Sequence, residues 1–400
     1  MNKEKFWLAI LLLVLMLDHY PSVKAKLNLP STPNLVVLGK ESLPIFSRQS
    51  LTPLENCSLS TTKTLTFNGA SSQNNKFGLY IYASGDNYVE KATTLINSQG
   101  GDWGYVTVPI DLQDLNYEVW RDLFTALEEK HLTPIVQLFN LKPSDQEPSL
   151  TWEDQTTKVA VFLNALPWPI KKRYLSVYNE PNDARFWWGK ASAKEYAQIL
   201  DLTINTFKNF NPDFFVMNGA FNASARNGGG YIDERQFLAQ MNQAVPGIFN
   251  RLDGWASHPY PQPNFTGSCR DSGRDSIRAY EWELEILRQN FGVTSLPVFI
   301  TETGWAHAEG KNYNPNFITE KDAAENIRQA FEKVWLPDDR VVAVTPFTIN
   351  YPAPFDHFAW VGADGQPFAQ YEMVKGLAKI AGQPPFRLVE TKIGLNCSGS

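Results

Sequence analysis

The sequence of 400 residues has few of the side chains that bind metal ions or nucleic acids. It contains only 5 histidines and 3 cysteines, and none of them cluster with the spacing of metal ligands. The formal net charge is -6, and no run of lysine and arginine forms a basic stripe along the chain. We therefore expect no metal, no other cofactor and no nucleic-acid partner.

A long apolar segment is missing as well. The apolar run from Phe6 to Leu17 follows two lysines and is short for a membrane-spanning helix. It leads to Val23-Lys24-Ala25, a small-residue site that a signal peptidase accepts. Residues 1–25 are therefore predicted to be a signal peptide, and the protein to be secreted or extracytoplasmic (periplasm, cell surface or outside). The alternative is an uncleaved N-terminal anchor, which alone would place the protein on a membrane.

The rest of the chain divides by composition. Residues 26–75 are rich in serine, threonine, proline and asparagine, which is typical of a linker or irregular extension. Apolar segments are spread evenly over residues 76–400, and 43% of the whole sequence is apolar, enough to bury a large core. We expect residues 76–400 to form one domain and the protein to be a monomer.

Strand-like apolar runs alternate with helical patterns through this domain. The expected strands are 77–83, 105–110, 133–139, 174–179, 214–218, 252–258, 297–303 and 341–349. Helix starts between them include Ser192 with Glu195, a capping box, and Asn116. The alternation predicts an α/β fold, a (β/α)₈ TIM barrel with an irregular N-terminal extension. An open doubly wound sheet is the alternative, but residues 83–88 lack the glycine spacing that binds a pyrophosphate.

The three cysteines are Cys57, Cys269 and Cys397. An oxidising compartment would permit one disulfide and one remaining thiol. Cys57 and Cys397 are the natural pair, because both flank the predicted barrel, whose first and last elements are neighbours. Three free thiols are the alternative.

Two glutamates lie at the ends of expected strands. Glu180 ends the fourth and Glu302 ends the seventh, and catalytic groups of a barrel collect at the C-terminal strand ends. Asn-Glu-Pro alone also fits an ordinary turn with a solvated Glu180. Glu302, however, follows a buried-type run, where an acid seldom occurs without a task or a partner. Two such carboxyl groups are able to divide the acid and nucleophile roles of glycoside cleavage.

Three motifs here resemble the retaining glycoside hydrolases of clan A, a barrel group that includes cellulases, β-xylosidases and β-1,3-glucanases. They are Tyr178-Asn-Glu-Pro181, His258-Pro-Tyr260 and Thr301-Glu-Thr-Gly-Trp305. The resemblance covers the chain from about residue 77 onward and assigns no individual family. It implies that Glu180 is the general acid/base and Glu302 the nucleophile. It further implies that Asn179 holds a sugar hydroxyl and that Tyr260 donates to the nucleophile.

Further residues are expected around the sugar. His258 lies on the same strand face as Tyr260 and would bond the sugar or its surroundings. Trp187 and Trp305 follow the two glutamates as stacking platforms, with core packing as the alternative. The resemblance implies an aromatic floor after the eighth strand, for which Trp360 and Tyr351 compete. The second and third strands end without the arginine of some clan members and offer only Asp111, Gln137 and Asn140.

The prediction is a retaining β-glycosidase or endo-β-glycanase that acts on an oligo- or polysaccharide through a covalent intermediate on Glu302. A transglycosylase would use the same residues. A catalytically inactive glycan-binding barrel and a structural or adhesion domain are the alternatives from other classes. The last of these predicts no pocket between the strand ends. Carboxyl groups more than about 10 Å apart would favour it and would exclude both glycosidase geometries.

Overall fold

The computed structural model describes residues 57–61, 73–85, 87–139, 151–384 and 393–397. Contacts divide the chain into two units, of which the larger runs from Thr61 to Ile393. The smaller contains a two-stranded sheet of β1 (Cys57–Thr61) and β10 (Ile393–Cys397). The predicted signal segment 1–25 lies outside the described residues. The side chains of Cys57 and Cys397 are not described either, so the disulfide between them stays a prediction. No helix of the described ranges is long and apolar enough to cross a membrane.

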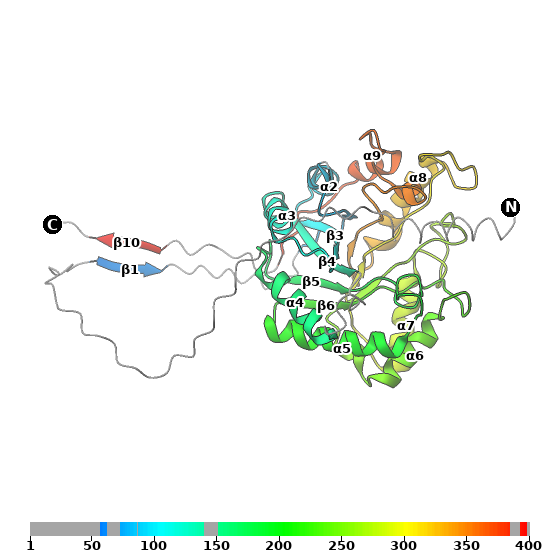
Figure 1. Ribbon diagram of the computed structural model, residues 1–400. Coiled ribbons are helices and arrows are strands. Elements are labelled where there is room, and N and C mark those ends of the chain that lie inside the picture. The colour runs from blue at the N-terminus through cyan, green and yellow to red at the C-terminus, as the bar shows by residue number, and fades with distance from the viewer. Residues whose placement is uncertain (1–56, 62–72, 86, 140–150, 385–392, 398–400) are drawn as a thin grey trace. The chain divides into compact units, whose positions relative to one another are not determined.

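The larger unit contains two parallel sheets (Figure 1). One has five strands in the order β2-β3-β4-β5-β6 and the other has three in the order β7-β8-β9. Their bounds are β2 (Gly78–Tyr80), β3 (Gly104–Asp111), β4 (Leu132–Phe139), β5 (Arg173–Val177), β6 (Phe214–Asn218), β7 (Trp255–Ser257), β8 (Val298–Ile300) and β9 (Val341–Val344). Each coincides with one expected strand, although several are shorter than expected. The predicted α/β class with parallel strands is confirmed.

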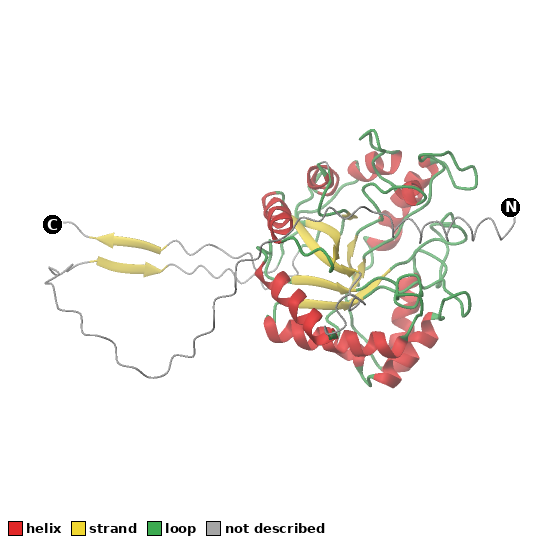
Figure 2. Ribbon diagram, viewed as in Figure 1, coloured by secondary structure: helices red, strands yellow, loops and turns green. Residues whose placement is uncertain are grey.

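Helices follow the strands and cover the outer side of the sheets (Figure 2). They are α2 (Tyr88–Ile96), α3 (Tyr117–Glu129), α4 (Trp152–Ala165), α5 (Ala193–Phe210), α6 (Glu234–Ala244), α7 (Ala279–Phe291), α8 (Glu320–Ala330) and α9 (Ala369–Lys375). Short helices span Ile248–Arg251, Phe331–Trp335 and Phe355–Phe358. Asn116 and Ser192 accept hydrogen bonds from backbone N–H groups at the starts of α3 and α5, as their sequences predict.

The two sheets meet at two seams. A parallel bridge joins Met217 of β6 to Gly254, next to β7, and another joins Phe77, next to β2, to Val344 of β9. At the first seam, the side-chain amide of Asn218 donates to the carbonyl of Ala256 at 3.0 Å and accepts from its N–H at 3.0 Å. Each seam thus has one isolated parallel bridge, and the first also has two side-chain bonds from Asn218.

An aromatic core lies between the sheets. Tyr174 of β5 contacts Phe299 of β8 with ring centroids 5.2 Å apart, and Tyr105 of β3 lies 6.4 Å from the same ring. These rings come from both sheets and are buried. Side chains at alternate positions, such as Leu175 and Val106, are fully buried in a second cluster with helix residues. Both faces of the strands are therefore covered, which leaves their C-terminal edge to carry polar groups.

Candidate active site

Both predicted catalytic glutamates lie at the C-terminal edge of the parallel strands. Glu180 follows β5 by three residues and Glu302 follows β8 by two. The chain turns sharply after β5, because Tyr178 and Glu180 have positive φ angles of 74° and 37°. The backbone N–H of Glu180 donates to the carbonyl of Ala220 at 2.9 Å, which ties this turn to the loop after β6. Such strained backbone often accompanies a functional site.

His258 connects the two glutamates. Its Nδ1 lies 3.3 Å from Glu180 Oε1, and its Nε2 lies 3.8 Å from Glu302 Oε1. The two nitrogens of one imidazole are a single ring carbon apart, so the carboxyl groups fall within the roughly 10 Å range of glycosidase pairs. The same Nε2 lies 3.0 Å from Thr301 Oγ1, which fixes the ring plane. The carboxyl groups therefore lie closer than the separation that would favour a purely structural domain.

Opposing influences act on Glu302. Burial raises the pKa of Glu302 above its ordinary value, and the charge of His258 and a hydrogen bond from Tyr260 offset only part of that rise. The Tyr260 hydroxyl donates to Glu302 Oε2 at 3.2 Å. The charge of Glu180 raises the pKa of Glu302, and an interaction with Gln137 lowers it. Burial alone would lower the pKa of His258, but the charges of Glu302 and Glu180 raise it above its ordinary value.

A chain of buried hydrogen bonds orients Asn179. The Tyr80 hydroxyl donates to Gln137 Oε1 at 2.6 Å, and Gln137 Nε2 donates to Asn179 Oδ1 at 3.0 Å. Since Oδ1 is engaged, the amide nitrogen of Asn179 is the group that would donate to a ligand. Asn179 is 7% exposed, directly beside Glu180.

The structure buries the three predicted tryptophans. Trp187 is 1% exposed and its indole N–H donates to Glu195 Oε2 at 2.9 Å. Trp305 is 4% exposed and donates to the backbone carbonyl of Gly267 at 2.7 Å. Both indole N–H groups thus have protein partners, an arrangement that favours the packing alternative over a sugar platform. Trp360 is 3% exposed within the hydrophobic core.

Tyr351 is the other candidate for the aromatic floor. Its ring lies 5.8 Å from that of Tyr82 and 5.5 Å from that of Phe347, centroid to centroid. Burial raises the pKa of Tyr351, and the nearby charge of Glu302 raises it further. The charge of Glu302, the second glutamate, thus reaches Tyr351.

Sequence reasoning missed part of this site. Tyr80 and Tyr82 alternate along the first expected strand, and that period of two was the available signal that both face one side. Gln137 was only one of three polar residues considered at the strand ends. Asp111 is exposed and accepts from the backbone N–H of Gln113, and Asn140 lies outside the described residues. For His258 the expectation was the sugar or its surroundings, and it lies between the two carboxyl groups.

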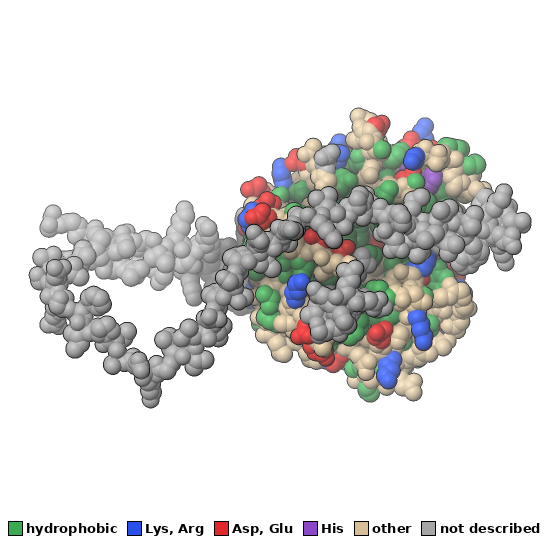
Figure 3. Space-filling view, viewed as in Figure 1, with side chains coloured by type: hydrophobic (Ala, Val, Ile, Leu, Met, Phe, Trp, Pro, Cys, Tyr) green, Lys and Arg blue, Asp and Glu red, His purple; other side chains and the backbone are tan. Residues whose placement is uncertain are grey.

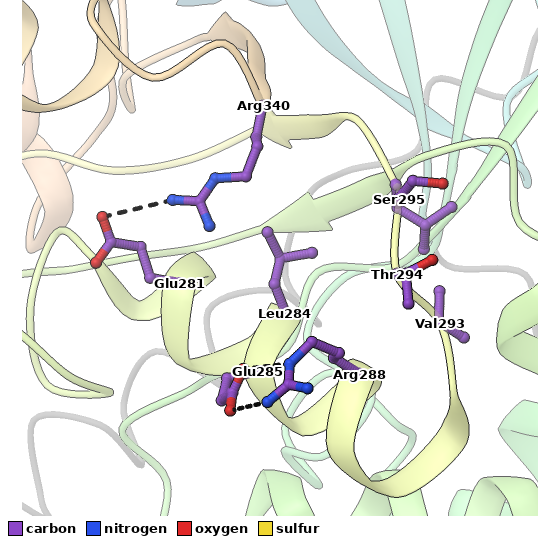
Figure 4. A pocket seen from close by; sticks show the side chains of 9 residues that line it. Glu281, Leu284, Glu285, Arg288, Val293, Thr294, Ser295 and Arg340 are labelled. Carbon is purple, nitrogen blue, oxygen red and sulfur yellow. Dashed lines mark hydrogen bonds and ion pairs between the residues drawn. The ribbon is translucent and has the colours of Figure 1, made fainter.

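Within the described part of the chain, no group of three or more His, Cys, Asp and Glu side chains is placed to hold a metal ion. Lysine and arginine are scattered over the visible face (Figure 3). A shallow pocket lies between α7 and residues 293–296, where Arg340 contacts Glu281 and Arg288 pairs with Glu285 (Figure 4). It is at the N-terminal ends of β8 and β9, opposite the glutamates.

No protein-family model and no curated protein matches the sequence. Solved structures with a similar fold are glycoside hydrolases. A GH2 β-galacturonidase from Eisenbergiella tayi aligns with a TM-score of 0.53 and 12% identity over 83% of this chain and 55% of that one. A GH128 endo-β-1,3-glucanase from Pseudomonas viridiflava aligns with a TM-score of 0.49 and 13% identity, over 76% of this chain and 99% of that one. This chain thus has a fold similar to that of the GH2 enzyme and spans about half of that enzyme's length.

Proposed function

We propose that the protein is a retaining β-glycosidase or endo-β-glycanase with Glu180 as general acid/base and Glu302 as nucleophile. The observation that carries the proposal is the contact of one imidazole, that of His258, with both carboxyl groups. The hydrogen bond from Tyr260 to Glu302 adds to it, because it favours the ionised form that a nucleophile needs. The substrate would be an oligo- or polysaccharide.

The proposed scaffold is a closed (β/α)₈ barrel made of β2 to β9. Support comes from the two seams, each with a parallel bridge and further bonds. At the second seam, the N–H of Val344 donates to the carbonyl of Lys76 at 2.9 Å, and the N–H of Tyr80 donates to the carbonyl of Pro346 at 3.0 Å. A barrel of this kind gathers its strand ends into one site, as this account requires for Glu180 and Glu302.

The reaction would take two steps. In the first, a carboxylate oxygen of Glu302 bonds to the anomeric carbon while the bond to the leaving oxygen breaks, and Glu180 gives its proton to that oxygen. In the second, Glu180 takes a proton from water, the water oxygen attacks the same carbon, and the ester to Glu302 breaks. Two inversions leave the β configuration unchanged. A sugar acceptor in place of water would give transglycosylation.

The surrounding residues suit these steps. Tyr260 and His258 favour the ionised form of Glu302 against the effect of its burial. The amide of Asn179, oriented by Gln137, is placed to hold the sugar hydroxyl next to the reacting carbon. An inactive glycan-binding barrel would have no need of a carboxyl pair maintained by these bonds. We also propose that the protein is secreted, which rests on its N-terminal sequence alone.

The test is a panel of aryl β-glycosides and β-glucans, with proton NMR of the first product formed. We expect a β-anomer as the initial product. Glu302→Gln should abolish turnover of the best substrate, whereas Glu129→Gln, an exposed change on α3, should leave it unaltered. An initial α-anomer, or a rate unaffected by Glu302→Gln, would overturn the proposal.

A further inference from the structure

The loops after β5 and β6 form a rigid pair beside Glu180. Asn182 fastens them, because its side-chain amide donates to the carbonyls of Asn222 and Ile232 at 3.0 and 3.1 Å and accepts from the N–H of Asn222 at 2.9 Å. Asp183 forms an antiparallel bridge with Tyr231. The backbone N–H of Asp183 donates to the carbonyl of Glu180 at 2.9 Å. Both loops are thereby fixed relative to the proposed acid.

This loop pair presents one oriented guanidinium. Arg185 donates from Nε and Nη2 to the carboxylate of Asp183, which is 1% exposed. The guanidinium also lies 5.3 Å from the ring centroid of Tyr231 and 5.7 Å from that of Phe186. These contacts fix the plane of the guanidinium at little further entropic cost on binding.

Part of this group is available to a ligand. The Arg185 side chain is 38% exposed, and no residue of the described chain accepts from its Nη1. Tyr231 is half-buried. Burial lowers the pKa of Arg185, but the hydrogen bonds and charge of Asp183 raise it above its ordinary value, and burial raises the pKa of Tyr231. The charge of Glu180 adds a smaller rise to both. A donor and an aromatic face therefore lie together on the side of the acid.

We propose that Arg185 and Tyr231 bind the sugar on the leaving-group side of the scissile bond. This inference rests on the proposed function. The general acid stands next to the leaving oxygen, so groups held beside Glu180 meet the departing sugar rather than the one attached to Glu302. Tyr231 would stack on an apolar sugar face and Arg185 would donate to a hydroxyl.

The charges favour a neutral sugar at this position. The positive charge of Arg185 is already compensated by Asp183, in a pair buried on the carboxylate side. Glu302 adds a negative charge nearby in its ionised form. A uronate would bring another carboxylate to a position without an uncompensated cation, at a cost that a neutral sugar avoids.

The test compares two substrates that share the glycone. One is the oligosaccharide that the wild-type protein cleaves fastest from a panel of β-1,3- and β-1,4-linked neutral oligosaccharides. The other is the 4-nitrophenyl glycoside of the same glycone, whose leaving group needs neither a sugar contact nor much protonation. The variants are Arg185→Lys, which keeps a cation for Asp183, and Tyr231→Ala. Arg121→Met on α3, where an exposed arginine pairs with Asp122, is the control.

We expect Arg185→Lys and Tyr231→Ala each to lower kcat/KM for the oligosaccharide by roughly 10- to 100-fold, chiefly through a higher KM. For the nitrophenyl glycoside, kcat/KM should change by less than about twofold. The wild-type protein should also cleave the oligosaccharide with a uronate in the leaving position at least about tenfold more slowly. Equal losses of kcat/KM on both substrates would show that Arg185 and Tyr231 have a structural role, and would refute this inference but not the proposed function. No loss on either substrate would refute it in the same way. A wild-type chain that cleaves neither substrate would refute the proposed function and this inference with it.

Discussion

At the scale of single residues, the proposed chemistry depends on how Glu302 is kept ionised although it is buried. Burial raises the pKa of Glu302, and the charge of His258 and the hydroxyl of Tyr260 act against that rise. Tyr260 is itself held among aromatic rings, with Phe265 at 5.2 Å and Phe358 at 5.9 Å between centroids. Its hydroxyl therefore has a fixed direction toward the carboxylate.

The first prediction concerns Tyr260→Phe. Loss of its hydrogen bond removes an influence that lowers the pKa of Glu302, so the acid limb of kcat/KM should move to higher pH. We expect kcat/KM at the optimum to fall by about 10- to 100-fold. A pH–rate profile against the best aryl glycoside measures both effects. Tyr313→Phe, on an exposed tyrosine, is the control, and an acid limb that stays in place would contradict the assignment.

The sequence indicated the proposed pair, Glu180 and Glu302, and the tyrosine beside Glu302, but not the part played by Gln137. Glu180 and Glu302 were recognisable because each follows a strand with a distinctive motif. Gln137 was not, because its role depends on simultaneous contacts with Tyr80 and Asn179 from two other strands. The sequence also shows that Trp187 and Trp305 follow the two glutamates closely, but it does not show which way their side chains point. Only tertiary packing directs the Trp187 indole to Glu195.

At the scale of elements, α6 and α7 bring two acids into the interior behind β7. Glu283 of α7 accepts from Trp255 Nε1 at 2.7 Å, and both Glu283 and Glu234 of α6 are fully buried. Among the described residues, neither carboxylate oxygen of Glu234 has a hydrogen-bond partner. Burial raises the pKa of Glu283 to about 7, and burial and the charge of Glu283 raise the pKa of Glu234. Such groups cost stability once they ionise.

The second prediction follows from the sign of these shifts. The pKa of Glu283 is raised above the ordinary value of 4.5 to about 7, so its contribution to stability is fully present below pH 4.5 and is lost as the pH rises through about 7. Glu283→Gln cannot ionise and should flatten this dependence. At pH 8 it should exceed the wild type in unfolding free energy by on the order of 2 kcal/mol.

Urea unfolding between pH 4.5 and 8 measures this dependence. Glu129→Gln on α3 is the control, and it should reproduce the wild-type curve. A Glu283→Gln curve parallel to the wild type would contradict the assignment of the pH dependence to this pair.

The existence and order of strands β2 to β9 followed from the sequence, because apolar runs mark the strands and capping residues mark the starts of helices such as α3 and α5. Their ends did not follow. The run 252–258 was expected as one strand, but only Trp255–Ser257 pairs regularly, because Pro259 and the turn after it take the chain toward the site. Likewise Glu195 was expected to complete a capping box with Ser192, whereas its carboxylate accepts from Trp187.

At the scale of the whole molecule, the account requires the two sheets to form one closed barrel. The hydrophobic pattern gives the number of strands but not the bonds that join the two sheets. In the structure these bonds include side chains. Asn218 of β6 pairs with Ala256 of β7, and Thr107 of β3 and Thr345, next to β9, are bonded through their hydroxyls at 2.7 Å.

The third prediction tests the first seam. Asn218→Ala leaves the backbone N–H and carbonyl of Ala256 buried without these partners and should lower the unfolding free energy by roughly 2 to 5 kcal/mol. At low pH the unfolding free energy of Asn218→Asp should lie between those of the wild type and Asn218→Ala, because its protonated carboxyl group is still able to donate one hydrogen bond. Asn205→Ala, on the exposed face of α5, should change stability by less than about 0.5 kcal/mol. Equal effects of Asn218→Ala and Asn205→Ala would show that the seam contributes little.

The central claim, a covalent glycosyl intermediate on Glu302, has a direct test. The protein is incubated with a panel of activated 2-deoxy-2-fluoro β-glycosides, which slow the second step so that the intermediate accumulates, and its peptides are analysed by mass spectrometry. We predict one fluoroglycosyl group per molecule, carried by Glu302, and faster loss of the label when a sugar acceptor is added. A label on another carboxylate, or no label from a glycone that the protein turns over, would contradict the account.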